Sequence, residues 1–173
     1  TSGCRARHPK ESPMRHALAA FILVLTVAAG PAVAGVVDSP LPAPFTQHVF
    51  TVPGVIQNGS SGTFFSCTNL DAANVTIGVE VFSSLGGAAS NDAAATSLSV
   101  AQGATVMFGT ITPVGYGINS NLGAGPMSKG SARILGTSKK IACTAWVANF
   151  ANDPPTSAFQ LTIIAKTKQK AAN

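Results

Sequence analysis

Charged residues are scarce in this chain of 173 residues, where Asp, Glu, Lys and Arg together make up 10%. Eleven Lys and Arg against six Asp and Glu give a formal net charge of +5, but a sequence with so few charges and 46% hydrophobic residues is not a disordered polyelectrolyte. Helix-favouring Glu, Lys, Leu and Arg are in short supply, whereas 17 Gly and 11 Pro suit short strands and turns. The composition predicts one packed domain built from strands.

Histidine and glutamate are almost absent beyond residue 34, where His48 and Glu80 are the only ones. A zinc site needs several converging His, Cys or acidic ligands, and a glycosidase needs a pair of placed carboxylates. The sequence has no Gly-x-Ser-x-Gly motif for a hydrolase, and the Gly-rich run 115–125 lacks the Gly-Lys-Ser/Thr end of a phosphate loop. We therefore expect a protein that is not an enzyme and that uses no metal and no cofactor.

The N-terminal region from Met14 has the three parts of a secretory signal peptide in the right order. A short basic start leads into the uncharged run 17–29, which a Gly-Pro pair and an Ala-x-Ala pattern for signal peptidase follow. We expect 14–34 to be a leader that is cleaved after Ala34, placing the domain in the periplasm or outside the cell. The alternative is a retained membrane anchor, because 17–37 is an uncharged stretch long enough to span a bilayer.

The segments around this leader suggest how the rest of the chain is organised. Residues 1–13 precede the leader's Met and are interpreted as an upstream extension. Prolines alternate in the second half of 35–44, which predicts an extended linker. We expect a single domain over 45–170, followed by a tail at 171–173. The Ala- and Gly-rich leader indicates a bacterial source.

Short runs of alternating apolar and polar residues predict seven or eight strands. The clearest is 74–82, where Val75, Ile77, Val79 and Val81 alternate with polar or small residues, as expected for a sheet with one face in the core. A tight turn at Gln102-Gly103 predicts a hairpin between two of these runs. The last run, 157–170, is expected to form a single strand along an exposed edge. The predicted strands are 45–52, 62–70, 74–82, 98–100, 104–110, 133–135, 140–149 and 157–170.

Two cysteines remain after the leader, Cys67 and Cys143, and each lies in a predicted strand. In an exported chain they are expected to form a disulfide, and the alternative is two separately buried thiols. One cysteine on an early strand and one on a late strand resemble the inter-sheet bridge of immunoglobulin-like domains. Trp146 follows the second cysteine, and Ile141 stands where those domains have a tyrosine, so the resemblance is one of architecture. It implies an all-β fold, a single immunoglobulin-like antiparallel β-sandwich.

Two features are candidate binding surfaces. The stretch 111–130 is rich in Gly and Pro, and a loop of that length in a compact domain is often functional. Its apolar and aromatic side chains are candidate ligand contacts, unless they fold back on the sandwich: Tyr116, Ile118, Leu122 and Met127. Lysines near the C-terminal end form a candidate basic surface for anionic glycans or an envelope surface, unless they are simply solvated edge charges: Lys139, Lys140, Lys166, Lys168 and Lys170.

Three functional hypotheses follow. The first is an exported, non-enzymatic β-sandwich with a role in adhesion, assembly or surface structure, whose partner is a protein or an envelope component and which forms homo-oligomers through sheet edges. The second is a small secreted binding module for a carbohydrate, lipid or protein ligand that uses the loop 111–130. The third is an enzyme with an unrecognised site. Nucleic acid is not an expected partner, because no dense Lys and Arg stripe is interleaved with aromatic residues. Membrane contact is expected only if the leader is retained.

Overall fold

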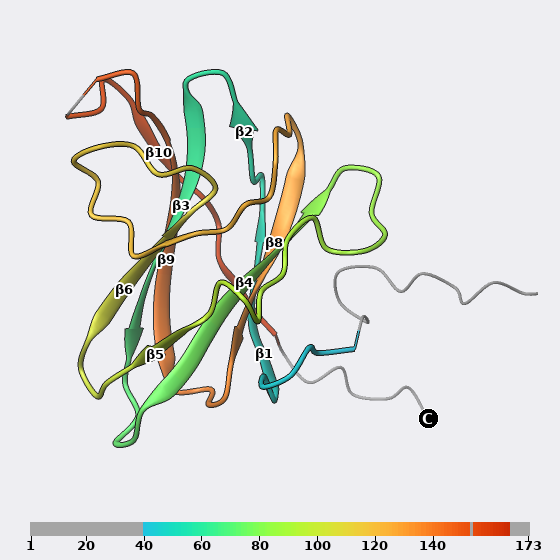
Figure 1. Ribbon diagram of the computed structural model, residues 1–173, viewed down its shortest axis with the longest axis vertical. Coiled ribbons are helices and arrows are strands. Elements are labelled where there is room, and N and C mark those ends of the chain that lie inside the picture. The colour runs from blue at the N-terminus through green and yellow to red at the C-terminus, as the bar shows by residue number, and fades with distance from the viewer. Residues whose placement is uncertain (1–39, 153, 167–173) are drawn as a thin grey trace, which may run out of the picture. The chain divides into compact units, whose positions relative to one another are not determined.

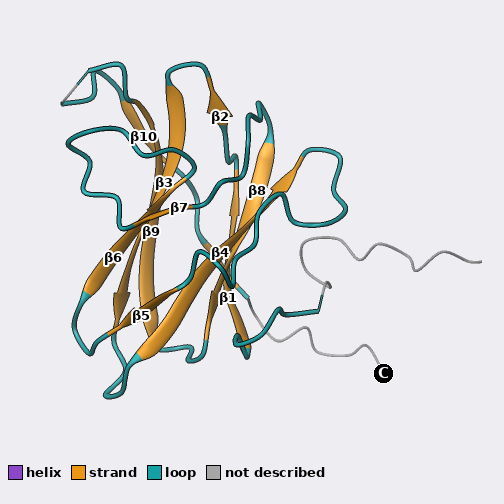
Figure 2. Ribbon diagram, viewed as in Figure 1, coloured by secondary structure: helices purple, strands orange, loops and turns teal. Residues whose placement is uncertain are grey.

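The computed structural model describes residues 40–152 and 154–166. Within these ranges the fold is all-β, with two sheets packed face to face and no helix (Figures 1 and 2). The described part of the chain contains no helix that could span a membrane. The predicted upstream extension, leader and tail all lie outside the described residues, as do Lys168 and Lys170.

The first sheet has five strands in the order β11-β1-β8-β4-β5. The second has the order β10-β9-β3-β6-β7, and β2 pairs with the start of β3, before the residues that pair with β6. All neighbouring strands run antiparallel except β6 and β7, which are parallel. The first sheet consists of β1 (Gln47–Pro53), β4 (Val75–Ser83), β5 (Leu98–Val100), β8 (Gly130–Gly136) and β11 (Ile164–Ala165). The second consists of β2 (Gln57–Asn58), β3 (Ser61–Asn69), β6 (Thr105–Gly109), β7 (Ser120–Asn121), β9 (Ile141–Asn149) and β10 (Ala158–Gln160).

The main core lies between the two sheets. Ile77, Val79 and Val81 of β4 are fully buried there, as their alternation predicted, and Phe65 and Phe108 meet them from the second sheet. The predicted strands 74–82 and 62–70 correspond to β4 and β3 within one residue at each end. Alternating patterns therefore identified the long central strands and their inward faces.

The outward face of the first sheet is covered as well. On β4, Gly78, Glu80 and Phe82 are buried although they point away from the main core. A small second cluster of Phe45, Ala93 and Leu135, with Leu41 packed against it, covers this side of the first sheet. The end of the predicted linker, from Pro40 onward, thus lies against the domain. Alternation in the sequence had suggested only one buried face for this strand.

The predicted hairpin at Gln102-Gly103 is wrong. The turn is present, since the amide of Ala104 donates to the carbonyl of Ala101 at 3.0 Å and Gly103 has a φ of 71°. However, β5 pairs with β4 in the first sheet, and β6 pairs with β3 in the second. The turn therefore carries the chain from one sheet to the other, which local turn chemistry does not distinguish from a hairpin.

The single strand predicted over 157–170 is also not observed. Ala158–Gln160 pairs with β9 at the edge of the second sheet, whereas Ile164–Ala165 pairs with β1 at the edge of the first. The chain crosses between the two sheets at 161–163. One short segment therefore forms the outermost strand of both sheets on the same side of the sandwich.

The comparison with immunoglobulin-like domains extends to the two-sheet layout. In the immunoglobulin fold the last strand lies beside the strand before it, in the C–F–G sheet. Here β9 pairs with β3 along its whole length, and β8 lies between β1 and β4. β10 also lies beside β9, so these pairings do not contradict the immunoglobulin-like arrangement, which stays a prediction.

Candidate functional site

The predicted disulfide is present. Cys67 of β3 and Cys143 of β9 are joined with an S–S distance of 2.11 Å, and their Cα atoms lie 4.1 Å apart. The two residues are direct partners in the register of neighbouring strands. The bond therefore lies within the second sheet, and the expectation of an inter-sheet bridge is wrong. Strand assignment from sequence places both cysteines correctly but does not say which strands are neighbours.

The outward edge of β9 is paired along only part of its length. β10 pairs with Trp146, Val147 and Ala148, and the next contact is from the Leu161 amide to the Ala145 carbonyl, at 2.9 Å. Beyond this contact no described strand pairs with β9 on that side. The edge is therefore open from Ala145 back toward the start of the strand.

Cys143 presents its backbone to this open edge. The 4.1 Å between its Cα atom and that of Cys67 is the short spacing of a strand pair without mutual hydrogen bonds, so the Cys143 N–H and C=O point away from β3. A hollow of about 440 Å³ lies at this place. It is lined by Cys143 and Thr144 of β9 on one side and by Gln160, Leu161, Thr162 and Ile163 on the other.

The edge segment, residues 158–165, is uncharged and strongly β-prone, reading Ala-Phe-Gln-Leu-Thr-Ile-Ile-Ala. Phe159 is 68% exposed and Ile164 is 51% exposed, although both lie on outermost strands. Natural sheets commonly protect such edges with charges, proline or a covering loop. An exposed, uncharged segment of this kind is a surface to which another strand can add.

The loop 111–130 folds back on the sandwich. Leu122 and Met127 belong to the main core, and the Tyr116 ring lies 5.0 Å from that of the fully buried Phe64. The Tyr116 hydroxyl also donates to the Asn149 carbonyl at 3.2 Å. Ile118 is half-buried. Three of the four candidate ligand contacts therefore pack against the domain itself.

The exposed apolar side chain of this loop is Val114, with 93% of its surface accessible. The sequence analysis did not single it out, because its pattern of neighbours resembles that of the buried residues nearby. Gly109 explains why the loop lies so close to the second sheet. A Cβ at that position would overlap the Ile111 carbonyl and press on the Phe64 ring.

The candidate basic residues do not gather into one paired site. Lys139 and Lys140 are exposed in the turn between β8 and β9, and Lys166 is exposed just after β11. Lys140 Nζ lies 3.5 Å from Asp71 Oδ1. The pKa of Asp71 is lowered first by a hydrogen bond from the Ser138 hydroxyl, then by the Ala72 amide and by Lys140. Lys140 is therefore partly neutralised by Asp71.

A buried polar row crosses the outward face of the first sheet. Thr51 of β1, Arg133 of β8 and Glu80 of β4 are direct partners across three strands. The Arg133 Nε donates to the Glu80 carboxylate, and Arg133 Nη2 donates to the Pro40 carbonyl at 2.9 Å. The guanidinium carbon also lies 5.6 Å from the centre of the Phe82 ring. Arg133 thereby fastens the N-terminal segment to the sheet.

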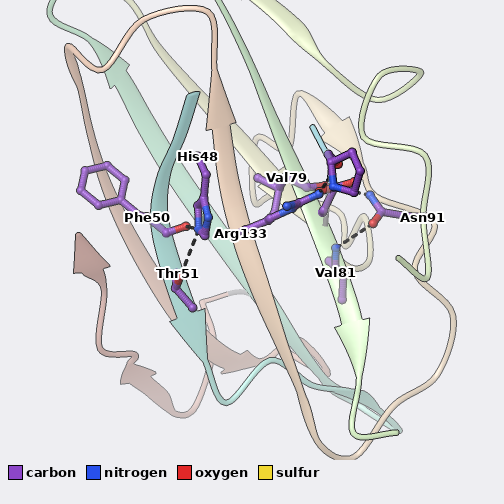
Figure 3. Close-up of polar contacts among 9 residues, drawn as sticks. His48, Phe50, Thr51, Val79, Val81, Asn91 and Arg133 are labelled. Carbon is purple, nitrogen blue, oxygen red and sulfur yellow. Dashed lines mark hydrogen bonds and ion pairs between the residues drawn. The ribbon is translucent and has the colours of Figure 1, made fainter. Parts of the chain in front are cut away.

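His48 is buried next to this row (Figure 3). Its Nε2 lies 3.0 Å from both the Phe50 carbonyl and the Thr51 hydroxyl oxygen, and because a carbonyl only accepts, Nε2 carries the proton. Its Nδ1 is buried without a hydrogen-bond partner. Burial first, and then the positive charges of Lys166 and Arg133, lower the pKa of His48 to about 4, against an opposing effect of the hydrogen bond with the Phe50 carbonyl. The imidazole is therefore neutral at pH 7.

Asn91 closes the free side of β4 (Figure 3). Its side-chain amide donates to the Val79 carbonyl and its side-chain oxygen accepts from the Val81 amide, each at 2.8 Å. One side chain thus takes the place of a strand at this edge. A side chain that imitates a neighbouring strand has no local signal in the sequence.

Within the described residues, no group of three or more His, Cys, Asp or Glu side chains could hold a metal ion. In comparisons with known proteins, no protein-family model matches the sequence, and neither a curated protein nor a solved structure matches the chain.

Proposed function

We propose that this chain is an exported, non-enzymatic β-sandwich protein with a structural, adhesion or surface-assembly role, and that it assembles through its sheet edges. One observation carries the proposal: the uncharged edge segment 158–165 forms the outermost strand of both sheets with Phe159 and Ile164 exposed. The partner is a second copy of the chain or another protein or envelope component that offers an extended strand.

Two observations support export. The sequence from Met14 has the order of regions of a signal peptide. The Cys67–Cys143 disulfide is compatible with an oxidising compartment such as the periplasm or the cell exterior. In this proposal the immunoglobulin-like label refers to the two-sheet layout alone.

The geometry favours this role over a binding module built on the loop 111–130. Leu122, Met127 and Tyr116 are occupied in packing against the sandwich, so the loop acts as a cover for the second sheet. The edge segment, in contrast, leaves apolar side chains in solvent. The non-enzymatic part of the proposal is supported by His48, the one histidine of the described residues, whose side chain is buried away from solvent.

The proposal is tested by introducing a charge at the exposed edge. We expect the chain to self-associate as its concentration rises, and Phe159→Lys to reduce the associated fraction several-fold, because a buried, unpaired charge opposes strand addition. Sedimentation velocity over a concentration series measures this fraction. The matched control is Leu85→Lys, since Leu85 is 95% exposed and lies in a loop between β4 and β5.

The control variant is expected to associate like the unchanged chain. A chain that remains monomeric over the whole series, alone and with extracts of its native envelope, contradicts the proposed role. So does a Phe159→Lys variant that associates as strongly as the control.

A further inference from the structure

The C-terminal strand shows a conflict between its local pattern and its place in the fold. Phe159, Leu161, Ile163 and Ala165 alternate as in one continuous strand, yet the chain leaves β9 at Leu161 and crosses to the other sheet. The result is two strands of three and two residues. Such a conflict marks residues 161–163 as a hinge at which two arrangements compete.

The hollow beside β9 has the right place and lining for the straight arrangement. Continuing the register of β10 along β9 places Leu161 opposite Ala145, Thr162 opposite Thr144 and Ile163 opposite Cys143. Except for Ala145, these are the residues that line the hollow from its two sides, together with Gln160. In the straight arrangement, residues 161–163 would therefore fill the hollow and pair with the part of β9 that has no strand partner on that side.

The faces of the two strands also match. Direct partners in an antiparallel pair share one face of the sheet, so Leu161 and Ile163 would lie on the face of Ala145, which belongs to the main core. Leu161 and Ile163 already pack against that core from their present positions. Straightening would also give the N–H and C=O of Cys143 a strand partner. The straight hinge therefore keeps its apolar contacts and adds backbone hydrogen bonds.

Few contacts hold β11 against β1. They are the pairs Phe50 with Ala165 and Thr51 with Ile164, and a hydrogen bond from the Lys166 amide to the Val49 carbonyl at 3.0 Å. Ile164 remains half-exposed there. A strand held by so few contacts can separate from β1 at a low cost in free energy.

We propose that β11 is exchanged between two copies of this chain: the hinge 161–163 straightens along β9, and Ile164–Ala165 pairs with β1 of the second copy. The partner is a second copy of this chain, because β1 already pairs with Ile164–Ala165 in one register and a second copy offers the same strand. The contacts at β1 are the same in both forms, so the balance is set by the new hydrogen bonds at β9 against the entropy of association. This inference rests on the proposed assembly through sheet edges and names its partner.

The exchange is tested by cross-linking two different single-site variants. Thr51→Cys and Ile164→Cys are prepared as separate chains, both with Cys4→Ser, mixed at high concentration and treated with a short bismaleimide. A cross-linked heterodimer is expected, because Thr51 and Ile164 are direct partners and each chain carries only one of the two reactive thiols. The control mixture pairs Ile164→Cys with Leu85→Cys, which is exposed but lies on a loop.

The outcomes separate this inference from the proposed function. Self-association in sedimentation without a heterodimer above the control mixture overturns the exchange and leaves assembly through the edges in place. The absence of any self-association overturns both. A heterodimer several-fold above the control supports the exchange.

Hinge length gives a second, independent test. Insertion of two glycines between Thr162 and Ile163 lets β11 reach its own β1 more easily, and we expect it to lower the dimer fraction several-fold. Insertion of two glycines between Gly86 and Gly87 is the matched control, because a Cβ at either position would meet nothing within 4 Å. A hinge insertion that leaves the dimer fraction unchanged overturns the exchange.

Discussion

At the scale of single residues, His48 makes the stability of the fold depend on pH. Its pKa is about 4 in the folded chain, and the ordinary value is 6.5. Between these values the unfolded chain binds the proton and the folded chain does not, so the free energy of unfolding falls as the pH is lowered from 6.5 to 4. Above 6.5 and below 4 this residue adds no slope. The 2.5-unit difference corresponds to about 3 kcal/mol at most.

We therefore expect urea unfolding of the chain to require less denaturant at pH 4.5 than at pH 7. His48→Gln keeps an N–H for the Phe50 carbonyl but cannot take up the proton, so its unfolding free energy should vary less over this range. Fluorescence of Trp146 follows the transition. An unchanged slope in the variant would assign the pH dependence to other groups.

The ion pair between Arg133 and Glu80 is the second residue-scale feature with a measurable effect. Both side chains are buried, and Arg133 also holds the Pro40 carbonyl. Arg133→Met leaves a buried carboxylate without its partner, and we expect it to lower the free energy of unfolding by about 3–5 kcal/mol. Adding Glu80→Leu to this variant removes the unpaired charge and should restore part of the loss.

Denaturant unfolding of the two variants measures this difference. A double variant that is as unstable as Arg133→Met would show that the cost comes from lost packing around Phe82 and Pro40, not from the charge.

At the scale of elements, the disulfide ties together the two longest strands of the second sheet. Closing the loop between residues separated by 76 positions is expected to stabilise the fold by about 4 kcal/mol, through the entropy of the unfolded chain. The double variant Cys67→Ser and Cys143→Ser should unfold at correspondingly lower denaturant concentration. Non-reduced and reduced wild-type chain serve as the comparison, and the reduced form should match the double variant. A wild-type midpoint that reductant does not move contradicts this expectation.

The elements that sequence predicts well are those whose surroundings are uniform along their length. β3 and β4 are buried on their inward faces from end to end, so alternation gives their position within one residue. The pattern identifies a face but not a neighbour. Local patterns therefore do not distinguish a hairpin from a crossing between sheets at Gln102-Gly103, or a disulfide between sheets from one within a sheet.

The elements that sequence predicts poorly are those that change partners. Ala158–Gln160 and Ile164–Ala165 satisfy one alternating pattern, but they lie on different sheets. The long-range contacts of β9 and β1 decide where the segment divides, and no local signal records them. Likewise, Asn91 and Arg133 gain their roles from strands and segments that are distant in sequence.

At the scale of the whole molecule, the chain itself covers the outward face of the first sheet and part of the outward face of the second. Residues of the N-terminal segment and of the loop after β4 cover the first sheet, and the loop 111–130 covers part of the second. The edge made by 158–165 is where uncharged, β-prone backbone meets solvent. Whatever the domain joins, this division of the surface favours strand addition at its edge over contact through its faces.

The covalent link between β3 and β9 also determines how the molecule would respond to being pulled. Tension applied at an assembled edge enters through residues 158–166, on one side of Cys143, and leaves through the N-terminal segment, on the other side of Cys67. The S–S bond joins the two ends of the intervening chain, so the segment that holds β4, β5, β6 and β8 cannot be drawn out along this path. Since an extended chain gains about 3.3 Å per residue, the bond withholds roughly 250 Å of extension. Units joined in this way would extend only by the residues that lie outside the covalent loop.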